Sequence, residues 1–183
     1  MKKLSMEELG RMSVEQFKAS RKLPLTVVLD NVRSLNNIGS VFRTSDAFRV
    51  ERICLCGITA TPPHRDIHKT ALGAEESVDW TYFEESSDCL ARLKDEGYLL
   101  FAVEQVDESL KLDQTETIRA LIAAQGDDAK VAIVMGNEVE GVQEELIPLC
   151  DACLEIPQFG TKHSLNVSCA ASIVIWEMFK MLR

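Results

Sequence analysis

The chain has 183 residues, of which 46% are hydrophobic, and its formal net charge at pH 7 is −9. This length predicts one globular domain with a substantial core, and the acidic balance argues against a generic nucleic-acid-binding protein. No run of about 18 apolar residues is present, and the N-terminus lacks the apolar stretch of a signal peptide, so we expect a cytoplasmic protein.

The first part of the chain predicts helices and strands in alternation, from hydrophobic periodicity and from Pro and Gly breaks. In chain order these are a short amphipathic helix over 5–22 that stops before Pro24, a strand over 25–30, a turn and helix over 36–48, a strand over 52–56, and a loop, with or without a short helix, over 61–77.

The second part continues the alternation. In chain order we expect a helix over 87–96, a strand over 98–103, a helix over 115–124, a strand over 131–135, a short helix over 142–149, a strand over 153–156 and a final helix from Cys169 to Met181. Short apolar strands that alternate with helices predict an α/β fold with a parallel sheet covered on both faces. Ligands of such sheets bind beyond the carboxyl ends of the strands, where the segments that start at Asn36, Gly136 and Gln158 fall.

Charge is distributed unevenly along the chain. Residues 1–69 contain 12 Lys and Arg against 7 Asp and Glu, whereas residues 70–183 contain 8 against 22. A basic face on the first part could steer a polyanion although the whole chain is acidic. An unevenly charged solvated surface is the alternative, and the sequence leaves both open.

Six cysteines in a chain of this kind are expected to be reduced thiols. Cys150 and Cys153 have the spacing of half a zinc site or of a redox pair, but Cys54 and Cys56 do not complete a zinc pattern. Because both pairs fall in or beside apolar runs, we expect buried thiols and no metal site.

Polar residues follow the last predicted strand, in a segment that runs from Ile156 to Ser168. A buried hydroxyl or amide without a partner costs roughly 1–3 kcal/mol, so Ser164, Asn166 and Ser168 need partners that a ligand could provide. The alternative is a helix N-cap, since Ser and Asn are preferred there, but a cap explains one of these residues and not all three.

The two earlier segments also combine glycine with polar side chains. On a helix, Arg43 would lie one turn from Gly39, and an Arg beside a helix N-terminus suits a phosphate or another anion. An exposed Arg on an amphipathic helix is the alternative. The run Met135–Val142 places two glycines between a strand and a helix, where the backbone can approach a ligand or simply turn; it is neither a dinucleotide fingerprint nor a Walker loop.

Taken together, the three segments resemble the SpoU/TrmH branch of the SPOUT methyltransferases. The matching motifs are Asn-x-Gly-x-x-x-Arg-Thr at 37–44, Met-Gly-Asn-Glu-x-x-Gly at 135–141 and Ile-Pro…Ser-Leu-Asn-x-Ser at 156–168. The stretch 69–75 is also similar to the segment that follows the second strand in these enzymes. Each motif is weak alone, but their order and spacing over 25–182 are specific.

The resemblance implies an α/β fold with a C-terminal trefoil knot, in which an N-terminal helical extension (1–24) precedes a SpoU-type methyltransferase domain (25–183). It also implies an S-adenosylmethionine-dependent RNA (ribose-2′-O)-methyltransferase that works as a homodimer, with active sites near the subunit interface. The order of helices and strands alone would not predict the knot, because connections that thread through a loop are rare in proteins.

The resemblance also assigns residues. Cofactor contacts, largely through backbone groups, are implied for Val103, Glu104, Met135, Gly136, Asn137, Ile156, Ser164 and Leu165. Catalytic or substrate-positioning roles are implied for Asn37, Arg43, Glu138, Ser164 and Asn166. The basic residues that we expect to contact RNA phosphates are Lys18, Arg21, Lys22, Arg33, Arg65 and Lys69.

Two roles are open for Arg43. The resemblance makes it the group that takes the proton of the ribose hydroxyl, yet a guanidinium is effectively always protonated in proteins. We favour a charged Arg43 that stabilises the developing alkoxide and clamps the neighbouring phosphate.

Three other functions are weighed against this one. A non-catalytic RNA-binding or assembly factor would share the fold, a thiol redox protein would use Cys150 and Cys153, and a generic nucleotide-binding domain would need a phosphate loop that the sequence lacks. Among RNA substrates we favour transfer RNA over ribosomal RNA, because no separate RNA-recognition domain is evident.

Overall fold

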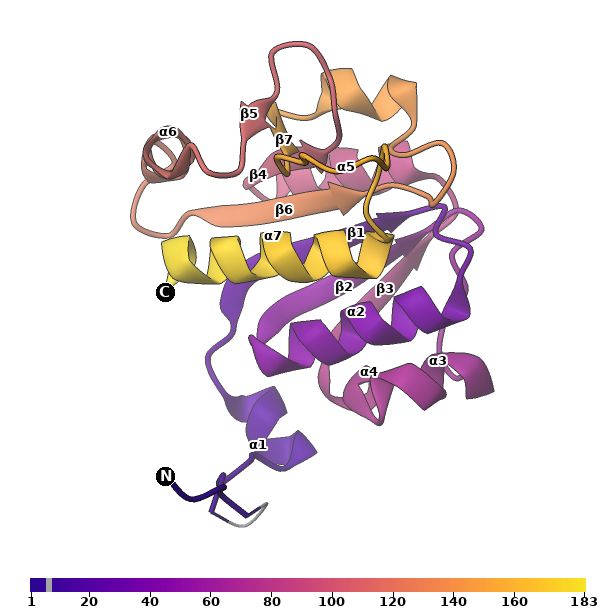
Figure 1. Ribbon diagram of the computed structural model, residues 1–183, viewed down its shortest axis with the longest axis vertical. Helices are drawn as coiled ribbons and strands as arrows, with labels where there is room; N and C mark the ends of the chain where they lie inside the picture. Colours follow the sequence, from indigo (N-terminus) through magenta and orange to yellow (C-terminus); the bar gives the residue numbers. More distant parts are fainter. Residues whose placement is uncertain (6–7) are drawn as a thin grey trace.

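A sheet of seven strands organises the chain, and each neighbouring pair of its strands is parallel. The computed structural model describes residues 1–5 and 8–183. The strand order across the sheet is β3-β2-β1-β6-β4-β7-β5 (Figure 1). The strands are β1 (Leu23–Asp30), β2 (Val50–Cys56), β3 (Asp79–Phe83), β4 (Tyr98–Val103), β5 (Leu110–Lys111), β6 (Lys130–Met135) and β7 (Ala152–Glu155).

Helices cover both faces of this sheet. They are α1 (Val14–Ala19), α2 (Leu35–Ala47), α3 (Arg65–Ala71), α4 (Ala74–Ser77), α5 (Ser86–Asp95), α6 (Thr115–Ala123), the 3₁₀ helix η1 (Glu144–Leu149) and α7 (Val167–Leu182). Helices α2 and α7 lie side by side in front of the sheet in Figure 1. None of the helices in the described part of the chain is both long enough and apolar enough to cross a membrane.

The side chains of each central strand alternate between two buried layers. Leu25, Val27 and Leu29 of β1 pack with apolar residues of α2, α6 and α7, whereas Val28 packs with those of α5 and η1. Burial on both faces explains why the central strands are apolar almost throughout. The predicted parallel sheet with helices on both faces is therefore confirmed, and the predicted strands all lie on β1, β2, β4, β6 or β7, with ends that agree to within two residues.

The helix predicted over 5–22 is wrong in length. Its described counterpart is α1, which spans only Val14–Ala19, and residues 6–7 of the prediction lie outside the described residues. Ser13 starts the helix with a capping box, because its Oγ accepts the N–H of Gln16 (3.2 Å) and its own N–H donates to the Gln16 side chain (2.9 Å).

Three further predictions need correction. The stretch 61–77 is not mainly a loop but contains both α3 and α4, which are separated by two residues with left-handed backbone, Leu72 (φ 53°) and Gly73 (φ 93°). Strands β3 and β5 were not predicted: β3 is an exposed edge strand without a buried apolar run, and β5 has two residues. The short helix predicted over 142–149 is the 3₁₀ helix η1, which contains Pro148, a residue with no N–H to donate.

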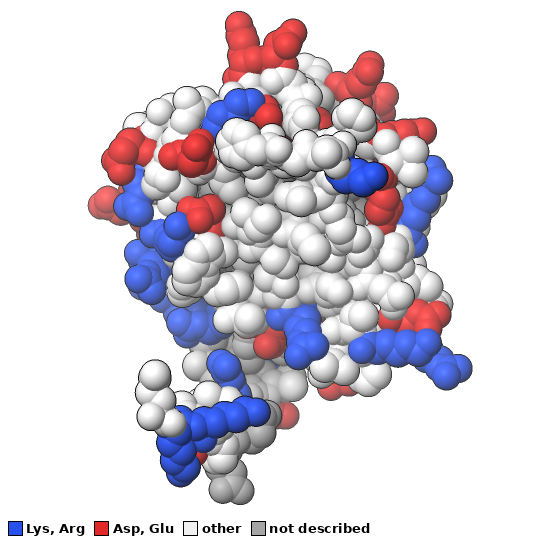
Figure 2. All heavy atoms as spheres, viewed as in Figure 1, with Lys and Arg blue, Asp and Glu red and all other residues white. Residues whose placement is uncertain are grey.

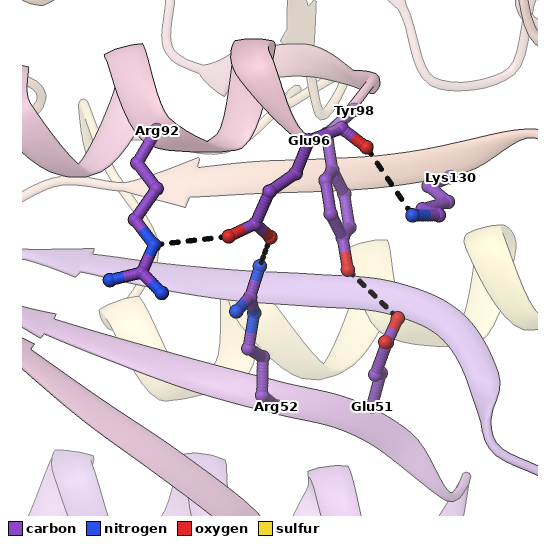
Figure 3. Close-up of polar contacts among 6 residues, drawn as sticks. All are labelled: Glu51, Arg52, Arg92, Glu96, Tyr98 and Lys130. Atoms are coloured by element: carbon purple, nitrogen blue, oxygen red, sulfur yellow. Dashed lines mark hydrogen bonds and ion pairs between the residues drawn. The ribbon is translucent and has the colours of Figure 1, made fainter.

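Polar side chains tie together the amino ends of the strands, at the opposite edge of the sheet from the segments singled out in the sequence (Figure 3). Glu96, at the end of α5, accepts hydrogen bonds from Arg52 and from Arg92 (Nε to Oε1, 3.0 Å). Tyr98 donates its hydroxyl hydrogen bond to Glu51 (2.9 Å), and Lys130 donates to the carbonyl oxygen of Glu96 (3.3 Å). This network joins the amino ends of β2, β4 and β6. The carboxyl ends of β4 and β6, at the other end of the sheet, contribute to the site.

The contact between α2 and α3 can be tested through Gly39. A Cβ at this position would lie 2.1 Å from Thr70 Oγ1 and 2.3 Å from the carbonyl oxygen of Ile67. We expect Gly39→Ala to lower the free energy of unfolding by about 2 kcal/mol, as overpacking does, measured by urea unfolding. Gly160→Ala is the control, because nothing lies within 4 Å of a Cβ there; equal stability of the two variants would contradict the packing described.

Candidate functional site

A crevice of about 290 Å³ opens at the carboxyl ends of β4, β6 and β7. Its volume is near the lower end of the range for small-molecule sites, roughly 300–1,000 Å³. All the residues for which cofactor contacts were predicted line it, namely Val103, Glu104, Met135, Gly136, Asn137, Ile156, Ser164 and Leu165. The crevice therefore brings together the second and third of the three segments singled out in the sequence.

Glu138 connects the crevice to the first segment. Its carboxylate accepts the backbone N–H groups of Arg33 and Ser34 (both 3.1 Å) and the side-chain amide of Asn37 (2.9 Å). Partial burial alone would raise the pKa of Glu138, but these donors, with Asn37 the largest, outweigh it and hold the pKa below its ordinary value of 4.5. Glu138 is thus held as a carboxylate beside the N-terminus of α2.

Asn166 extends this connection to the third segment. Its side-chain amide donates to Asn37 Oδ1 (3.1 Å), and its own Oδ1 accepts the N–H groups of Ser168 (3.0 Å) and Cys169 (3.4 Å) as the N-cap of α7. The Ser168 hydroxyl donates to the same oxygen (2.6 Å). A cap therefore accounts for two of the three polar residues, whereas Ser164 lines the crevice. Ser164 and Asn166 are exposed, so the expectation that they are buried is wrong.

The turn after β6 is a tight hairpin that Gly136 makes possible. The backbone of Asn137 pairs with that of Gly141 in both directions (3.0 and 3.1 Å), and Asn137 Oδ1 accepts the N–H of Val139 (2.8 Å). A Cβ on Gly136 would lie 2.0 Å from the carbonyl carbon of Gly141. Position 136 requires glycine because the backbone at Gly141 packs directly against it. The sequence had left open whether the glycine serves a turn or the approach of a ligand, and the hairpin alone accounts for it.

A buried carboxylate that the sequence reading missed fixes the far end of this turn. Asp30, at the end of β1, is fully buried and accepts the backbone N–H of Gln143 (3.1 Å), its side-chain amide (2.7 Å) and the hydroxyl of Ser86 (2.6 Å). Glu104 accepts the N–H of Val142 (3.0 Å). An Asp at the end of an otherwise apolar strand was the available signal, because a buried charge needs partners.

Gln105 is a second missed residue, and it holds the exposed segment that closes one side of the crevice. Its side-chain amide donates to the carbonyl oxygen of His163 (3.1 Å), and both residues line the crevice. No motif marked Gln105, since it lies in a polar loop after β4.

Negative charge dominates the lining of the crevice. Glu104, Glu138, Glu140 and Glu155 contribute to it, and His163 is the only basic residue among the lining residues that the structure describes. Such a lining favours a cationic ligand over a phosphate, which argues against a generic nucleotide site.

Arg43 lies outside the crevice of its own chain. Both Asn37 and Arg43 are on α2, but six residues of α-helix advance about 9 Å and turn the side chain to a different face. Arg43 is exposed and instead lines a separate hollow beside the N-terminal segment. A single chain therefore joins Asn37, Glu138 and Asn166 but does not bring Arg43 to them.

The basic residues expected to contact RNA are dispersed. Lys18, Arg21, Arg33 and Arg65 are exposed. The amine of Lys22 donates to the carbonyl oxygens of Phe17 (2.5 Å) and Lys18 (3.1 Å), which fixes the end of α1. Lys69 pairs with Asp66 (2.6 Å).

The cysteines do not form a reactive pair. Cys150 and Cys153 are free thiols, and burial raises the pKa of both, to about 12 for Cys150. Thiolates, the reactive form, are therefore disfavoured at neutral pH. Within residues 1–5 and 8–183, no group of three or more His, Cys, Asp or Glu side chains could hold a metal ion.

Comparison with known proteins connects this geometry to one family. The model of the SpoU rRNA methylase family matches residues 24–176. A Staphylococcus saprophyticus protein named as a TrmH family tRNA/rRNA methyltransferase is 28% identical over 167 residues, which cover 91% of this chain and 63% of that protein. Relatives from Staphylococcus aureus match to the same extent, so the chain spans about 63% of the length of these curated relatives.

Solved structures agree with this match. The AdoMet-bound rRNA methyltransferase from Sinorhizobium meliloti has a TM-score of 0.75 and 26% identity, and the match covers 89% of this chain and 58% of that one. The TrmH/SpoU tRNA-modifying enzyme of A. aeolicus has a TM-score of 0.76 and 24% identity over 92% of this chain and 80% of that one, and it shows the shared fold.

The lowered pKa of Glu138 predicts how acid affects the fold. Above the ordinary value of 4.5 the charged carboxylate and its hydrogen bonds stabilise the folded chain; as the pH falls through the lowered folded-state pKa, the carboxylate is protonated and this stabilisation is lost. Glu138→Gln should therefore destabilise the protein at about pH 7 and have a smaller effect at about pH 3, measured by urea unfolding.

Glu140→Gln is the matched control, because Glu140 is an exposed carboxylate on the same turn. It should leave stability unchanged at both pH values. A loss of stability in Glu138→Gln that is the same at every pH would contradict the hydrogen-bonded carboxylate.

Proposed function

We propose that this chain, which belongs to the SpoU rRNA methylase family, transfers a methyl group from S-adenosylmethionine to a ribose 2′-hydroxyl of RNA. The observation that carries the proposal is the pair of hydrogen bonds that joins Glu138, Asn37 and Asn166 at the rim of the crevice. These residues come from the three motifs, so one place holds both a small-molecule site and the groups that would orient an acceptor.

The crevice would hold the methyl donor, which supplies a methyl group activated on a positively charged sulfur. Three lining carboxylates, Glu104, Glu138 and Glu140, favour that positive charge, whereas the fourth, Glu155, is paired with Lys111. Gly136, Ile156 and Leu165 would contact the donor largely through backbone groups, and Gln105 would hold the segment around Ser164 over it. A small site with several fixed polar groups would also keep the donor in one orientation, which an in-line transfer requires.

Asn37 and Glu138 would orient the ribose, and Arg43 would stabilise its 2′-oxygen while the hydroxyl proton passes to solvent water. Because a guanidinium stays protonated, we assign Arg43 electrostatic stabilisation of the alkoxide and contact with the adjacent phosphate. Arg43 does not reach the crevice of its own chain, so the proposal requires the Arg43 of a second copy.

The exposed face of α2 and α7 supports such a homodimer. In Figure 2 the middle of this face carries almost no charged side chains. Trp176 and Ile173 are 46% and 39% exposed there, and Trp176 packs against Phe48 and Phe179 at ring-centroid distances of 5.6 and 5.8 Å. An uncharged, aromatic surface of this kind is typical of the core of a subunit interface.

The RNA remains a prediction. Transfer RNA is our first candidate, and the curated relatives are named for both tRNA and rRNA. Mass spectrometry of ribose-methylated nucleosides in tRNA and rRNA from a deletion strain would separate them; a loss confined to rRNA would contradict the preference. The cytoplasmic location likewise stays a prediction, and retention of the protein in a membrane fraction would contradict it.

Two features of the fold are also proposals. We propose that the segment after β7 passes through a loop to form a trefoil knot. Its place in the lining of the crevice beside the turns after β4 and β6, and the hydrogen bond from Gln105 to the His163 carbonyl oxygen, support this. An experimental backbone trace without threading would contradict it. We also keep an extension that ends near residue 24, because the family match begins at residue 24 and β1 begins at Leu23. Since Phe17 of the extension belongs to the main hydrophobic core, removal of 1–22 should lower the free energy of unfolding, and complete loss of folding would contradict a separate extension.

Substitution of Arg43 tests its role in the reaction. We expect Arg43→Ala to lower kcat by about 10²–10³-fold at saturating RNA and donor, as removal of an oxyanion-stabilising group does, with Arg43→Lys losing less. Transfer of labelled methyl to RNA measures both. The control is Arg119→Ala, an exposed arginine on α6, which should keep full activity. Near-normal kcat in Arg43→Ala would refute the assignment.

Hybrid dimers test whether Arg43 acts across the interface. Leu165→Arg places a positive charge in the crevice and should abolish donor binding, while Arg43→Ala lacks the guanidinium. Each variant should be inactive alone, but co-expression should restore about a quarter of wild-type activity, because half the dimers then contain one intact site. No recovery, with hybrid dimers demonstrated by differential tags, would show that Arg43 acts within its own chain or not at all.

A further inference from the structure

A second hollow, of about 560 Å³, lies between the N-terminal segment and helices α2 and α4. Three arginines from three parts of the chain line it: Arg11 before α1, Arg43 on α2 and Arg49 in the turn after α2. We call it the arginine hollow. In Figure 2, Lys and Arg side chains are frequent over the N-terminal segment and over α2 and α3, whereas acidic side chains gather at the opposite end of the molecule.

The N-terminal segment is fixed where it borders the arginine hollow. Phe17 of α1 is 5% exposed and belongs to the main hydrophobic core, and Ser13 caps the helix that follows Arg11. The amine of Lys22 lies 4.8 Å from the centre of the Phe17 ring and closes the other end of α1. Arg11 is therefore placed next to α2 by packing and not by chance proximity of a loose end.

The guanidinium groups of the arginine hollow are available to a ligand. In the part of the chain that the structure describes, no carboxylate lies within 4.0 Å of the side-chain nitrogens of Arg11, Arg43 or Arg49. Of the two acidic residues in the lining, Asp46 already accepts the hydroxyl of Ser77 (2.5 Å). The balance in the hollow is thus positive, the reverse of the crevice.

The backbone at Arg49 allows a substitution that tests the arginine hollow. Its φ of 53° is in the left-handed region, which is unfavourable for a residue with a Cβ and would suit Gly. Arg49 directly follows the C-cap of α2, where left-handed residues are common, so Arg49→Gly removes the guanidinium without opposing the backbone conformation.

We infer that the arginine hollow binds the phosphate backbone of the RNA on the stretch next to the nucleotide whose ribose meets Arg43. The identity of the ligand as RNA rests on the proposed function. Guanidinium groups match phosphate oxygens in geometry and charge, and three of them around one hollow can follow successive phosphates. The N-terminal segment thereby forms one wall of the substrate site and contributes Arg11 to it.

Another hollow with basic residues, among them Arg21 and Lys22 that were expected to contact RNA, is less suited to phosphates. It lies at the amino ends of the strands and is lined by Arg21, Lys22, Arg119 and Lys130 together with Glu51, Asp127 and Asp128. The amines of Lys22 and Lys130 already donate to backbone carbonyl oxygens. Four basic side chains face three acidic ones in this hollow, but two of the four basic groups are engaged in this way, so Arg119 provides a matched control.

The test uses Arg49→Gly and Arg11→Ala in the full chain, with Arg119→Ala as the control. The probes are end-labelled unfractionated tRNA and unfractionated rRNA, retained on filters at several salt concentrations without S-adenosylmethionine. We expect each of the first two variants to bind RNA about tenfold more weakly and to reduce the slope of log affinity against log salt by about 1. Arg49→Gly should unfold at the same temperature as the wild type or above it, since it relieves the left-handed backbone.

The outcomes separate the two proposals. Unchanged affinity and salt slope in Arg49→Gly and Arg11→Ala, or an equal loss in Arg119→Ala, would overturn the inference even if the wild type methylates RNA. Because the assay needs no methyl transfer, the expected losses would support the hollow as an RNA site even if the proposed reaction failed. Weaker binding accompanied by a lower unfolding temperature in Arg49→Gly would count against it, as it would show damage to the fold.

Discussion

Two hydrogen bonds carry the architecture of the site. The Asn37 amide donates to Glu138, across 101 positions of sequence, and the Asn166 amide donates to Asn37, across 129. They join the N-terminus of α2 to the hairpin after β6 and to the N-terminus of α7, and the backbone N–H groups of Arg33 and Ser34 add two further bonds to Glu138. Two of these side chains also fix local backbone: Glu138 accepts the N–H groups of Arg33 and Ser34 just before α2, and Asn166 caps α7. The site and the local structure thus depend on the same side chains, and loss of one would affect both.

The sheet allows this arrangement because the amino and carboxyl ends of its strands have different roles. The amino ends are closed by the network around Glu96, while the carboxyl ends carry loops held by buried or partly buried carboxylates, Asp30 above all. The outcome is an electrostatic division of the molecule. Carboxylates line the crevice, where a cationic donor would bind, and three arginines line a separate hollow near the other end of α2, where a polyanion would bind. An acidic chain can therefore serve an RNA substrate, since local fields and not net charge decide where each ligand is attracted.

Much of this was predictable from the sequence, and the remainder has identifiable causes. The central strands were found because burial on both faces makes them continuous apolar runs, and the crevice residues were found because three motifs share an order and spacing. β3 was missed because an edge strand does not need such a run, and α1 was overestimated because the Ser13 cap is stronger than the amphipathic pattern before it. The position of Arg43 relative to Asn37 depends on the helical rotation between them and on assembly, which motif spacing does not record. The anchoring of the β6 hairpin to Asp30 depends on which loops meet in space.

The central claim is that the crevice at the ends of β4, β6 and β7 is a site for the methyl donor. Titration calorimetry of the intact chain with S-adenosylmethionine tests it most directly, because neither RNA nor catalysis is needed. We expect saturable binding of one donor per chain. S-adenosylhomocysteine, which lacks the methyl group, should compete for the same site. Absence of binding heat at all temperatures tried, with a folded protein confirmed by its circular dichroism, would contradict the account.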